Sequence, residues 1–197
     1  MTENSAGGVL LDFDGTLTKA IINWPVMKDE MKLEDDTKIL EFLKTAPPGR
    51  AREVAEILER HEVDAARRAE ANEGARELVD YLRGREIPFG IVTNNAWHHV
   101  EVMLGRIGLA VEKVITRDIG IWKPDPRHVL AGAEAIGVAP ERCIFIGDGR
   151  LDMLAARGAG MTSVHLSDGR AGDQGPECDY RVEGLREAMA LIGRLIP

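Results

Sequence analysis

A short apolar run that ends in two acids constrains the fold of this chain more than any other feature. Residues 9–11 are Val-Leu-Leu, and Asp12 and Asp14 follow at once, with Gly15 beyond them. An apolar run of this kind predicts the end of a buried strand, and Gly15 predicts the loop that terminates it. Because ligands gather at the carboxyl ends of parallel strands, the acids are expected where chemistry is done. Unpaired carboxylates are costly to bury, so the pattern also indicates a cation beside them.

The spacing to the next strand predicts an inserted segment. That strand is expected over residues 87–92, about 70 residues beyond Leu17, whereas a complete strand-helix-strand unit needs only about 30 residues. The surplus shows the apolar spacing of helices rather than the composition of a disordered loop. We therefore expect a small helical cap over residues 20–71, inserted into a core made of residues 1–19 and 72–197.

Strands and helices are expected to alternate from residue 75 to the end of the chain. Apolar runs at 87–92, 113–116, 143–146 and 162–166 predict strands, and the stretches between them have helical periodicity. A Gly-rich polar loop and a last helix are expected after the final run. This alternation predicts right-handed crossovers and a Rossmann-like α/β fold with a doubly wound parallel sheet.

Polar residues collect at the ends of the predicted strands. They are Asp12 and Asp14 after the first strand, Thr93 and Asn94 after the second, and Asp148 and Asp152 after the fourth. If the first and fourth strands are neighbours, Asp12, Asp14 and Asp148 meet where the strand order reverses. Carboxylates crowded in this way raise one another's pKa unless a cation is present, and hard oxygen ligands favour Mg²⁺. We therefore expect Mg²⁺ as the cofactor.

The charge balance restricts the class of partner. The 197 residues carry a formal net charge of −8, and the basic residues are scattered among acids, which disfavours nucleic acid as a partner. An anionic substrate would need positive charge placed locally at its site. The chain has only two cysteines and no apolar segment of the roughly 18 residues that a membrane span requires. We expect a cytoplasmic protein with reduced thiols and no membrane partner.

Four motifs, in order along the chain, resemble those of a known family. They are Asp12-Phe13-Asp14-Gly15-Thr16-Leu17-Thr18, Thr93 at a strand end, Lys123 before Pro124, and Gly147-Asp148 with Asp152 four residues later. The set is similar to the motifs of the haloacid dehalogenase superfamily, in its phosphatase branch. The resemblance covers the chain outside the insertion, whose helices look like the small cap of that superfamily. The overall layout most resembles phosphoglycolate phosphatase-like members.

The resemblance implies roles for the three acids nearest the predicted switch point. Asp12 would be the nucleophile that forms an aspartyl-phosphate. Asp14 would protonate the leaving oxygen and then activate water, as covalent catalysis in two steps requires. The carboxylates of Asp12 and Asp148 and the main-chain carbonyl of Asp14 would bind Mg²⁺.

The remaining motif residues are expected to bind the phosphoryl group or to support the site. Thr93 and Asn94 would donate hydrogen bonds to phosphoryl oxygens, and Lys123 would supply the local positive charge. Asp152 is expected to orient Lys123 or a metal-bound water rather than to bind the ion itself.

The function expected from this resemblance is a Mg²⁺-dependent phosphomonoesterase that acts on a small phosphorylated metabolite. The alternative within catalysis is a sugar-phosphate mutase of the β-phosphoglucomutase type, which uses the same intermediate. A noncatalytic phospho-accepting or binding module on the same fold is the alternative from another class, since a fold does not determine a function. The identity of the substrate and the oligomeric state stay open at this point.

Overall fold

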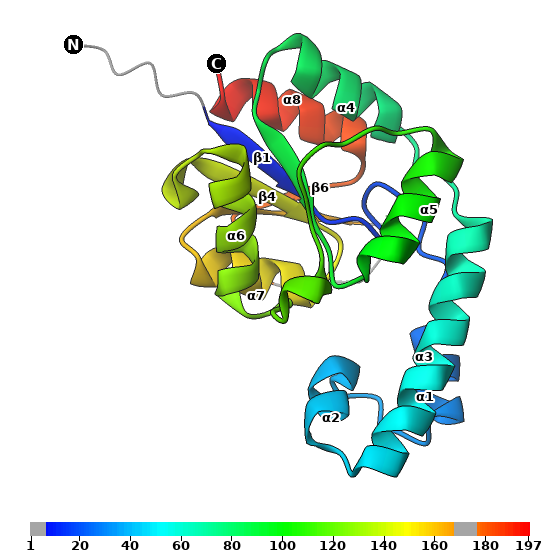
Figure 1. Ribbon diagram of the computed structural model, residues 1–197. Coiled ribbons are helices and arrows are strands. Elements are labelled where there is room, and N and C mark those ends of the chain that lie inside the picture. The colour runs from blue at the N-terminus through cyan, green and yellow to red at the C-terminus, as the bar shows by residue number, and fades with distance from the viewer. Residues whose placement is uncertain (1–6, 168–176) are drawn as a thin grey trace. The chain divides into compact units, whose positions relative to one another are not determined.

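The computed structural model describes residues 7–167 and 177–197, and the chain divides into two compact units. One unit comprises Met1–Ala20 and Glu70–Pro197, and the other comprises Ile21–Ala69. Figure 1 shows the elements of each unit in chain order. Each unit has its own buried side chains, so they are described in turn.

The larger unit is built on a six-stranded parallel sheet with the order β3-β2-β1-β4-β5-β6. The strands are β1 (Gly8–Leu11), β2 (Phe89–Val92), β3 (Val114–Ile115), β4 (Cys143–Gly147), β5 (Thr162–Leu166) and β6 (Tyr180–Val182). From β1 the chain proceeds to β2 and β3 on one side, then returns to β4 on the other side of β1. The order therefore reverses between β1 and β4, which is where a doubly wound sheet holds its ligands.

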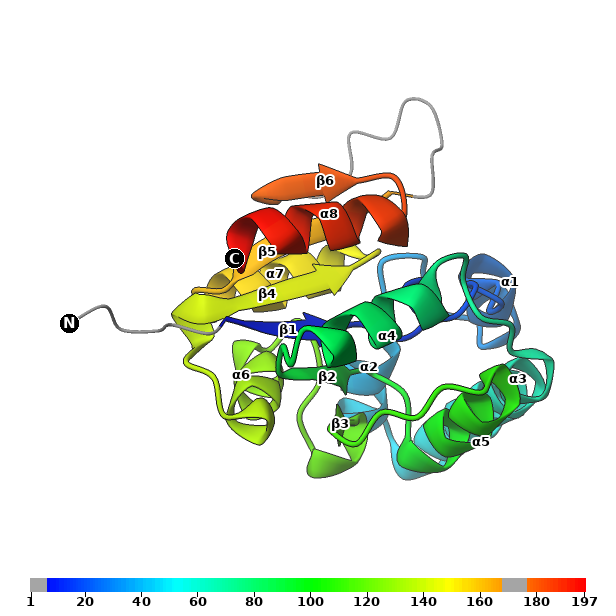
Figure 2. The same ribbon diagram turned by 90° about the horizontal axis from the view of Figure 1, so that it is seen from above.

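Helices cover both faces of this sheet. They are α4 (Ala75–Gly84), α5 (Trp97–Ile107), α6 (Pro126–Ile136), α7 (Arg150–Gly158) and α8 (Leu185–Leu195), with 3-10 turns at η1 (Arg117–Ile119) and η2 (Pro140–Arg142). Helices α4 and α8 lie together on one face and α6 and α7 on the other (Figure 2). The predicted Rossmann-like α/β fold is confirmed.

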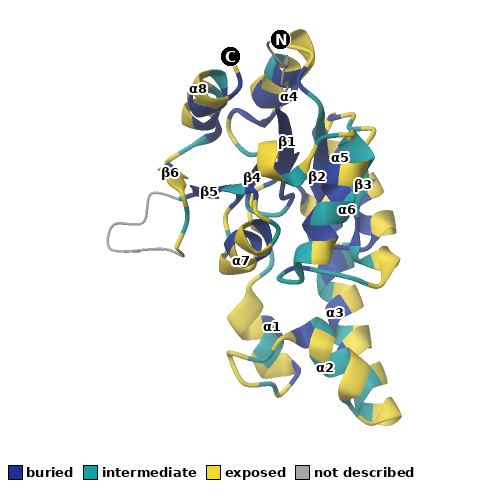
Figure 3. Ribbon diagram, turned by 90° about the vertical axis from the view of Figure 1, so that its left-hand side faces the viewer, coloured by how far each residue is buried: buried dark blue, intermediate teal, exposed yellow. Residues whose placement is uncertain are grey.

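The central strand is apolar because helices cover it on both sides. Every residue of β1 is buried, and Leu10 is paired with Gly90 of β2 and Phe145 of β4. Leu10 and Phe145 pack with Val129 of α6 and Met153 of α7 in one core cluster. Figure 3 shows this buried centre in dark blue, with exposed residues on the outer faces of the helices.

Local sequence explains where several helices begin and end. Helix α6 starts after Asp125, whose side chain accepts the main-chain N–H of Arg127, and Pro126 occupies the first turn. Proline suits this position because its missing N–H would have no partner within the helix. The same helix is terminated by Gly137, the residue after Ile136, whose φ of 70° is a left-handed conformation that glycine adopts at little cost.

The smaller unit consists of three helices. They are α1 (Trp24–Glu30), α2 (Ile39–Thr45) and α3 (Pro48–Arg68). Its buried cluster contains Met27 and Met31 near α1, Ile39 of α2, and Val54 and Leu58 of α3. Because this insertion buries apolar side chains of its own, its helices are more than a long connecting loop.

A hydrogen-bonded stem in the larger unit carries the two ends of the insertion. Thr18 and Ala71 form an antiparallel bridge, and the N–H of Asn72 donates to the carbonyl of Leu17 over 2.9 Å. Lys19 and Glu70 add an ion pair of 2.7 Å. The chain therefore leaves the core and returns to it through two paired segments.

The sixth strand, β6, was not predicted from the sequence, where only a loop was expected before the last helix. β6 has three residues, and Tyr180 and Arg181 are exposed. An edge strand this short has no apolar run to reveal it. The expected Gly-rich loop falls mostly on residues 168–176, which lie outside the described residues. Among the helices that the structure describes, none is long and apolar enough to cross a membrane.

Candidate active site

Three acids meet at the carboxyl ends of β1 and β4. Asp12 follows β1 directly, and its N–H donates to the carbonyl of Ile146 in β4 over 2.8 Å. Asp148 follows β4, and Asp152 lies in the first turn of α7. One carboxylate oxygen from each of Asp12, Asp148 and Asp152 lies within 4.8 Å of the other two. The pairing of β1 with β4 thus brings acids far apart in the sequence into one group.

Two glycines allow the acidic loops to approach so closely. Gly15 has a φ of 80°, and a Cβ added there would overlap the carboxylate of Asp148. A Cβ on Gly147 would lie 2.5 Å from Cγ of Asp152, much closer than a normal contact. Any other residue at either position would have to push an acid out of the group.

Lys123 is a buried cation that joins two of these acids. Its Nζ lies 2.5 Å from Oδ1 of Asp12 and 2.6 Å from Oδ1 of Asp152, and all three side chains are buried. The other oxygen of Asp152 accepts the N–H of Gly149 over 2.9 Å. Asp152 therefore holds Lys123 against Asp12 from a fixed position at the start of α7.

The pKa values of Lys123, Asp12 and Asp148 show whether this arrangement favours the charged or the neutral form of each side chain. Burial alone would lower the pKa of Lys123, but the carboxylates of Asp12 and Asp152 raise it above its usual value, so the amine stays protonated. The pKa of Asp12 is raised by burial and by Asp152, against the opposing effect of Lys123. Burial and Asp152 raise the pKa of Asp148 to about 7, against the opposing effect of Lys123. One lysine thus does not fully compensate three carboxylates.

The end of β2 contributes a second set of polar groups. The hydroxyl oxygen of Thr93, which is buried, accepts the main-chain N–H of Asn95 over 3.1 Å. Its hydroxyl hydrogen can therefore be donated elsewhere. The side chain of Asn94 is bound to the main chain of Lys123, whose N–H donates to Oδ1 over 2.8 Å and whose carbonyl accepts from Nδ2 over 3.0 Å. Asn94 thus ties the end of β2 to the loop that carries Lys123.

Asp14 is contacted by residues that the sequence analysis did not assign. Nδ2 of Asn95 donates to Oδ2 of Asp14 over 2.5 Å, and Oγ1 of Thr18 lies 3.4 Å from Oδ1. The Thr-Asn-Asn run at the end of the second strand was visible, but nothing in it distinguishes the third residue from the second. Asp148, too, has a contact that was not expected from the sequence: Nε2 of His165 in β5 lies 2.9 Å from its main-chain carbonyl oxygen.

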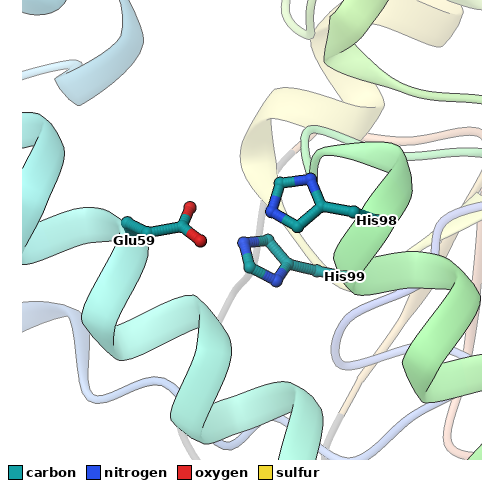
Figure 4. A group of neighbouring side chains, drawn as sticks. All are labelled: Glu59, His98 and His99. Carbon is teal, nitrogen blue, oxygen red and sulfur yellow. The ribbon is translucent and has the colours of Figure 1, made fainter.

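The histidine pair at the start of α5 belongs to none of the predicted motifs. His98 is exposed and His99 is buried, and their ring centroids are 3.8 Å apart. Figure 4 shows the two rings projecting from the first turn of the helix, together with Glu59 of α3. Glu59 belongs to the other compact unit, so we assign no common site to the three residues.

The family of the chain follows from comparison with known proteins. The family model of haloacid dehalogenase-like hydrolases matches residues 7–160. The chain belongs to this family. The match includes all seven residues predicted for the site, and it agrees with the resemblance inferred from the motifs.

The relatives of this haloacid dehalogenase-like hydrolase include proteins named phosphoglycolate phosphatase. One from Xanthomonas campestris is 34% identical over 137 residues, which are 66% of this chain and 62% of that protein. Another, from Escherichia coli, is 30% identical over 148 residues, which are 74% of this chain and 54% of that protein. The chain thus spans between about half and three fifths of these curated relatives.

Solved structures confirm the fold. A hydrolase from Pseudomonas syringae matches with a TM-score of 0.82 at 23% identity, over 97% of this chain and 100% of that one. A hydrolase of the same superfamily from Deinococcus radiodurans has a TM-score of 0.71 at 22% identity. At these identities the likeness concerns the fold alone.

A divalent metal ion is the usual cofactor of haloacid dehalogenase-like hydrolases, and the acids of this chain fit one. Carboxylate oxygens are the donors that hard cations select. Burial and the neighbouring carboxylate of Asp152 raise the pKa values of Asp12 and Asp148, so both acids would be easier to ionise beside a second cation. A metal ion between these two acids would be that cation.

Proposed function

We propose that this protein is a Mg²⁺-dependent phosphomonoesterase that hydrolyses a small phosphorylated metabolite through an aspartyl-phosphate. The observation that carries the proposal is the contact of Asp12, at the tip of the central strand, with Lys123 over 2.5 Å, beside Asp148 and Asp152. A surface carboxylate has no need of a buried lysine held in place by a second acid. A nucleophile that must approach an anionic phosphoryl group does need such compensation.

The first step in this proposal transfers the phosphoryl group to Asp12. A carboxylate oxygen of Asp12 attacks phosphorus, the bond from phosphorus to the substrate oxygen breaks, and Asp14 gives its proton to that oxygen. The product alcohol leaves, and Asp14 is left ionised. Such a proton transfer typically contributes 10²- to 10⁴-fold to the rate.

The second step returns the enzyme to its starting state. Asp14, now a carboxylate, takes a proton from water while the water oxygen attacks phosphorus. The bond between phosphorus and Asp12 breaks, which releases inorganic phosphate and leaves Asp14 protonated for the next cycle. One residue thus serves as acid and then as base, which two-step covalent catalysis requires.

The other predicted residues have supporting roles in this proposal. Asp12, Asp148 and the main-chain carbonyl of Asp14 would hold Mg²⁺, which would neutralise charge on the phosphoryl oxygens. Thr93 would donate its hydroxyl hydrogen to one of these oxygens, and the main chain at Asn94 would donate beside it. Asp152 would act through Lys123.

Lys123 together with the proposed metal ion also fits an anionic substrate. The chain has a net charge of −8, so an anionic substrate is repelled at long range unless the site is locally compensated. Lys123 and a bound divalent cation would provide that compensation. Because two relatives carry the name phosphoglycolate phosphatase, phosphoglycolate is the first substrate to test.

Phosphate release from a panel of phosphorylated metabolites tests the proposal. We expect turnover of phosphoglycolate or another small phosphate monoester with Mg²⁺, loss of turnover with a chelator, and loss of at least about 10³-fold in Asp12→Asn. Asp80→Asn, which makes the same change on the exposed surface of α4, is the matched control and should keep full activity. No release from any substrate by folded, Mg²⁺-loaded protein would refute the proposal.

A further inference from the structure

Asn95 is held in place mainly through its main chain. It is buried, with 8% of its surface exposed. Its main-chain N–H donates to Thr93 Oγ1, and its carbonyl accepts the N–H of Arg117 over 3.1 Å. Its Nδ2 also lies 4.0 Å from the sulfur of Met103 in α5. A buried residue whose main chain is held in this way can impose an orientation on the group that its side chain contacts.

What Asn95 contacts is the carboxyl group of Asp14. The 2.5 Å bond from Nδ2 to Oδ2 is far shorter than the 3.4 Å separation between Thr18 Oγ1 and Oδ1. Thr18 also donates to the carbonyl of Phe13 over 3.2 Å, so its hydroxyl is shared. Of these two contacts, the one from Asn95 therefore does more to set the direction of the carboxyl group.

The chemistry of an amide suits this position. A neutral amide orients a carboxyl group without adding charge to a crowded acidic site, whereas a lysine would bind the carboxylate as a fixed ion pair. Asn95 is also two residues from Thr93, and the two are joined by a hydrogen bond. One short loop thus holds both the group assigned to the phosphoryl oxygens and the group that orients the proton donor.

We propose that Asn95 is a positioning residue, whose side-chain amide directs the carboxyl of Asp14 toward the leaving oxygen and then toward the attacking water. This inference rests on the proposed phosphatase function. In this proposal Asn95 contacts neither the substrate nor the phosphorus and acts only through the carboxyl group of Asp14. Loss of the amide removes one of the contacts that orient the carboxyl of Asp14, while Asp12, Lys123 and the proposed Mg²⁺ ligands remain in place.

Leaving-group dependence distinguishes this role from a general structural one. An alkyl phosphate needs its leaving oxygen protonated, whereas 4-nitrophenyl phosphate releases a stable anion and needs the acid much less. In Asn95→Leu, which keeps the size and removes the amide, we expect kcat/KM to fall about 100-fold for the alkyl phosphate. For 4-nitrophenyl phosphate we expect a fall of less than about fivefold. Asn95→Ala should show the same pattern and serves if the leucine variant does not fold.

A second readout comes from the base step, which both substrates share. With 4-nitrophenyl phosphate, Asn95→Leu should show a burst of nitrophenol close to the enzyme concentration, followed by slow turnover, because hydrolysis of the aspartyl-phosphate becomes limiting. In the Asp14→Asn background the same substitution should change kcat/KM by less than about twofold, since the residue it orients is already lost. Val102→Ala, on the exposed face of α5, is the control and should match the wild type.

Each outcome decides between specific accounts. Equal losses on the two substrates, or a full loss in the Asp14→Asn background, would show that Asn95 only maintains the fold of the loop. Unchanged kinetics in both Asn95 variants would refute the positioning role outright. A folded, Mg²⁺-loaded wild-type protein that releases phosphate from no substrate of the panel would instead refute the proposed function, and the inference would be withdrawn with it.

Discussion

At the scale of single residues, the site depends on one buried cation shared by two acids. Lys123 contacts Asp12 and Asp152 with side-chain exposures of 3%, 8% and 6%, respectively. The free energy of such a group comes from mutual compensation, because each charge alone would be expensive to bury. Loss of the lysine would therefore leave two buried carboxylates without a compensating charge, which is more costly than the loss of two ordinary hydrogen bonds.

Replacing Lys123 with methionine should strongly destabilise the metal-free protein near neutral pH. The apolar side chain has a similar length but leaves Asp12 and Asp152 without their cation. Removal of one partner from a buried ion pair typically costs about 3–5 kcal/mol. Urea unfolding measures this cost. Lys19→Met, which breaks the exposed pair with Glu70, is the matched control and should cost no more than about 1 kcal/mol. Equal losses in the two variants would contradict the account.

Asp148 should make the metal-free protein less stable as the pH rises. Its pKa in the folded protein is about 7, compared with 3.8 for an ordinary aspartate, so the folded state binds this proton more tightly than the unfolded state. Its stabilising contribution is therefore complete below pH 3.8 and is lost as the pH rises toward 7. Asp148→Asn should thus raise the melting temperature of the metal-free protein at pH 8 and leave it unchanged at pH 3.5.

Addition of Mg²⁺ provides the control for this experiment. The ion should raise the melting temperature of the wild type at pH 8 and have little effect on Asp148→Asn, which lacks one of the proposed ligands. A gain in the variant that is the same at both pH values, or equal stabilisation of both proteins by Mg²⁺, would argue against the assignment.

At the scale of elements, the site is made by the ends of β1 and β4 and by the glycines that let their loops meet. Gly15→Ala should reduce kcat/KM at least about 100-fold, because the added Cβ would displace the carboxylate of Asp148 and misplacement of about 1 Å can cost that much. Far-UV circular dichroism should stay unchanged.

A substitution at a second glycine tests whether Gly15→Ala loses activity because the acid is displaced or because the backbone is strained. Gly160 has a φ of 72°, close to the 80° of Gly15, and a Cβ there would meet no atom within 4 Å. Gly160→Ala should therefore carry similar strain and keep its activity. If both variants lost activity to the same degree, the close approach of Gly15 to Asp148 would not be the reason.

Regular elements were predictable from the sequence because their physical signals are local. The apolar runs and the helical spacing indicated five strands of the sheet, and the alternation indicated its doubly wound topology. β6 was missed because an exposed edge strand of three residues has no such signal. Its pairing with β5, at Val164 and Tyr180 among others, depends on the fold as a whole.

The site was predictable in composition but less so in its contacts. The acids follow strands, and strand order was expected to bring Asp12, Asp14 and Asp148 together, whereas the carboxylates that lie within 4.8 Å of one another are those of Asp12, Asp148 and Asp152. The tie between Asn94 and the main chain of Lys123 was not, because it joins loops 29 residues apart. The contact between Asn95 and Asp14 spans 81 residues and has no motif of its own. Their roles in catalysis stay predictions.

At the scale of the whole molecule, the residues predicted for the site and the inserted helices belong to different compact units. All seven residues predicted for the site lie in the sheet-containing unit, and Ile21–Ala69 has a separate buried cluster. That the insertion acts as a cap stays a prediction. We propose that the carboxylate of Asp12, in the sheet-containing unit, becomes phosphorylated and is regenerated in every cycle.

Direct detection of that intermediate is the most decisive measurement. Asp14→Asn should accumulate it from 4-nitrophenyl phosphate, because the first step with this substrate needs little acid and the second step lacks its base. Acid quenching, reduction of the acyl phosphate with borohydride and peptide mass spectrometry then locate the modified residue. We predict conversion of Asp12 to homoserine, and none in Asp12→Asn. Modification of a different residue, or none at all in a protein whose wild type hydrolyses the same substrate, would contradict the account.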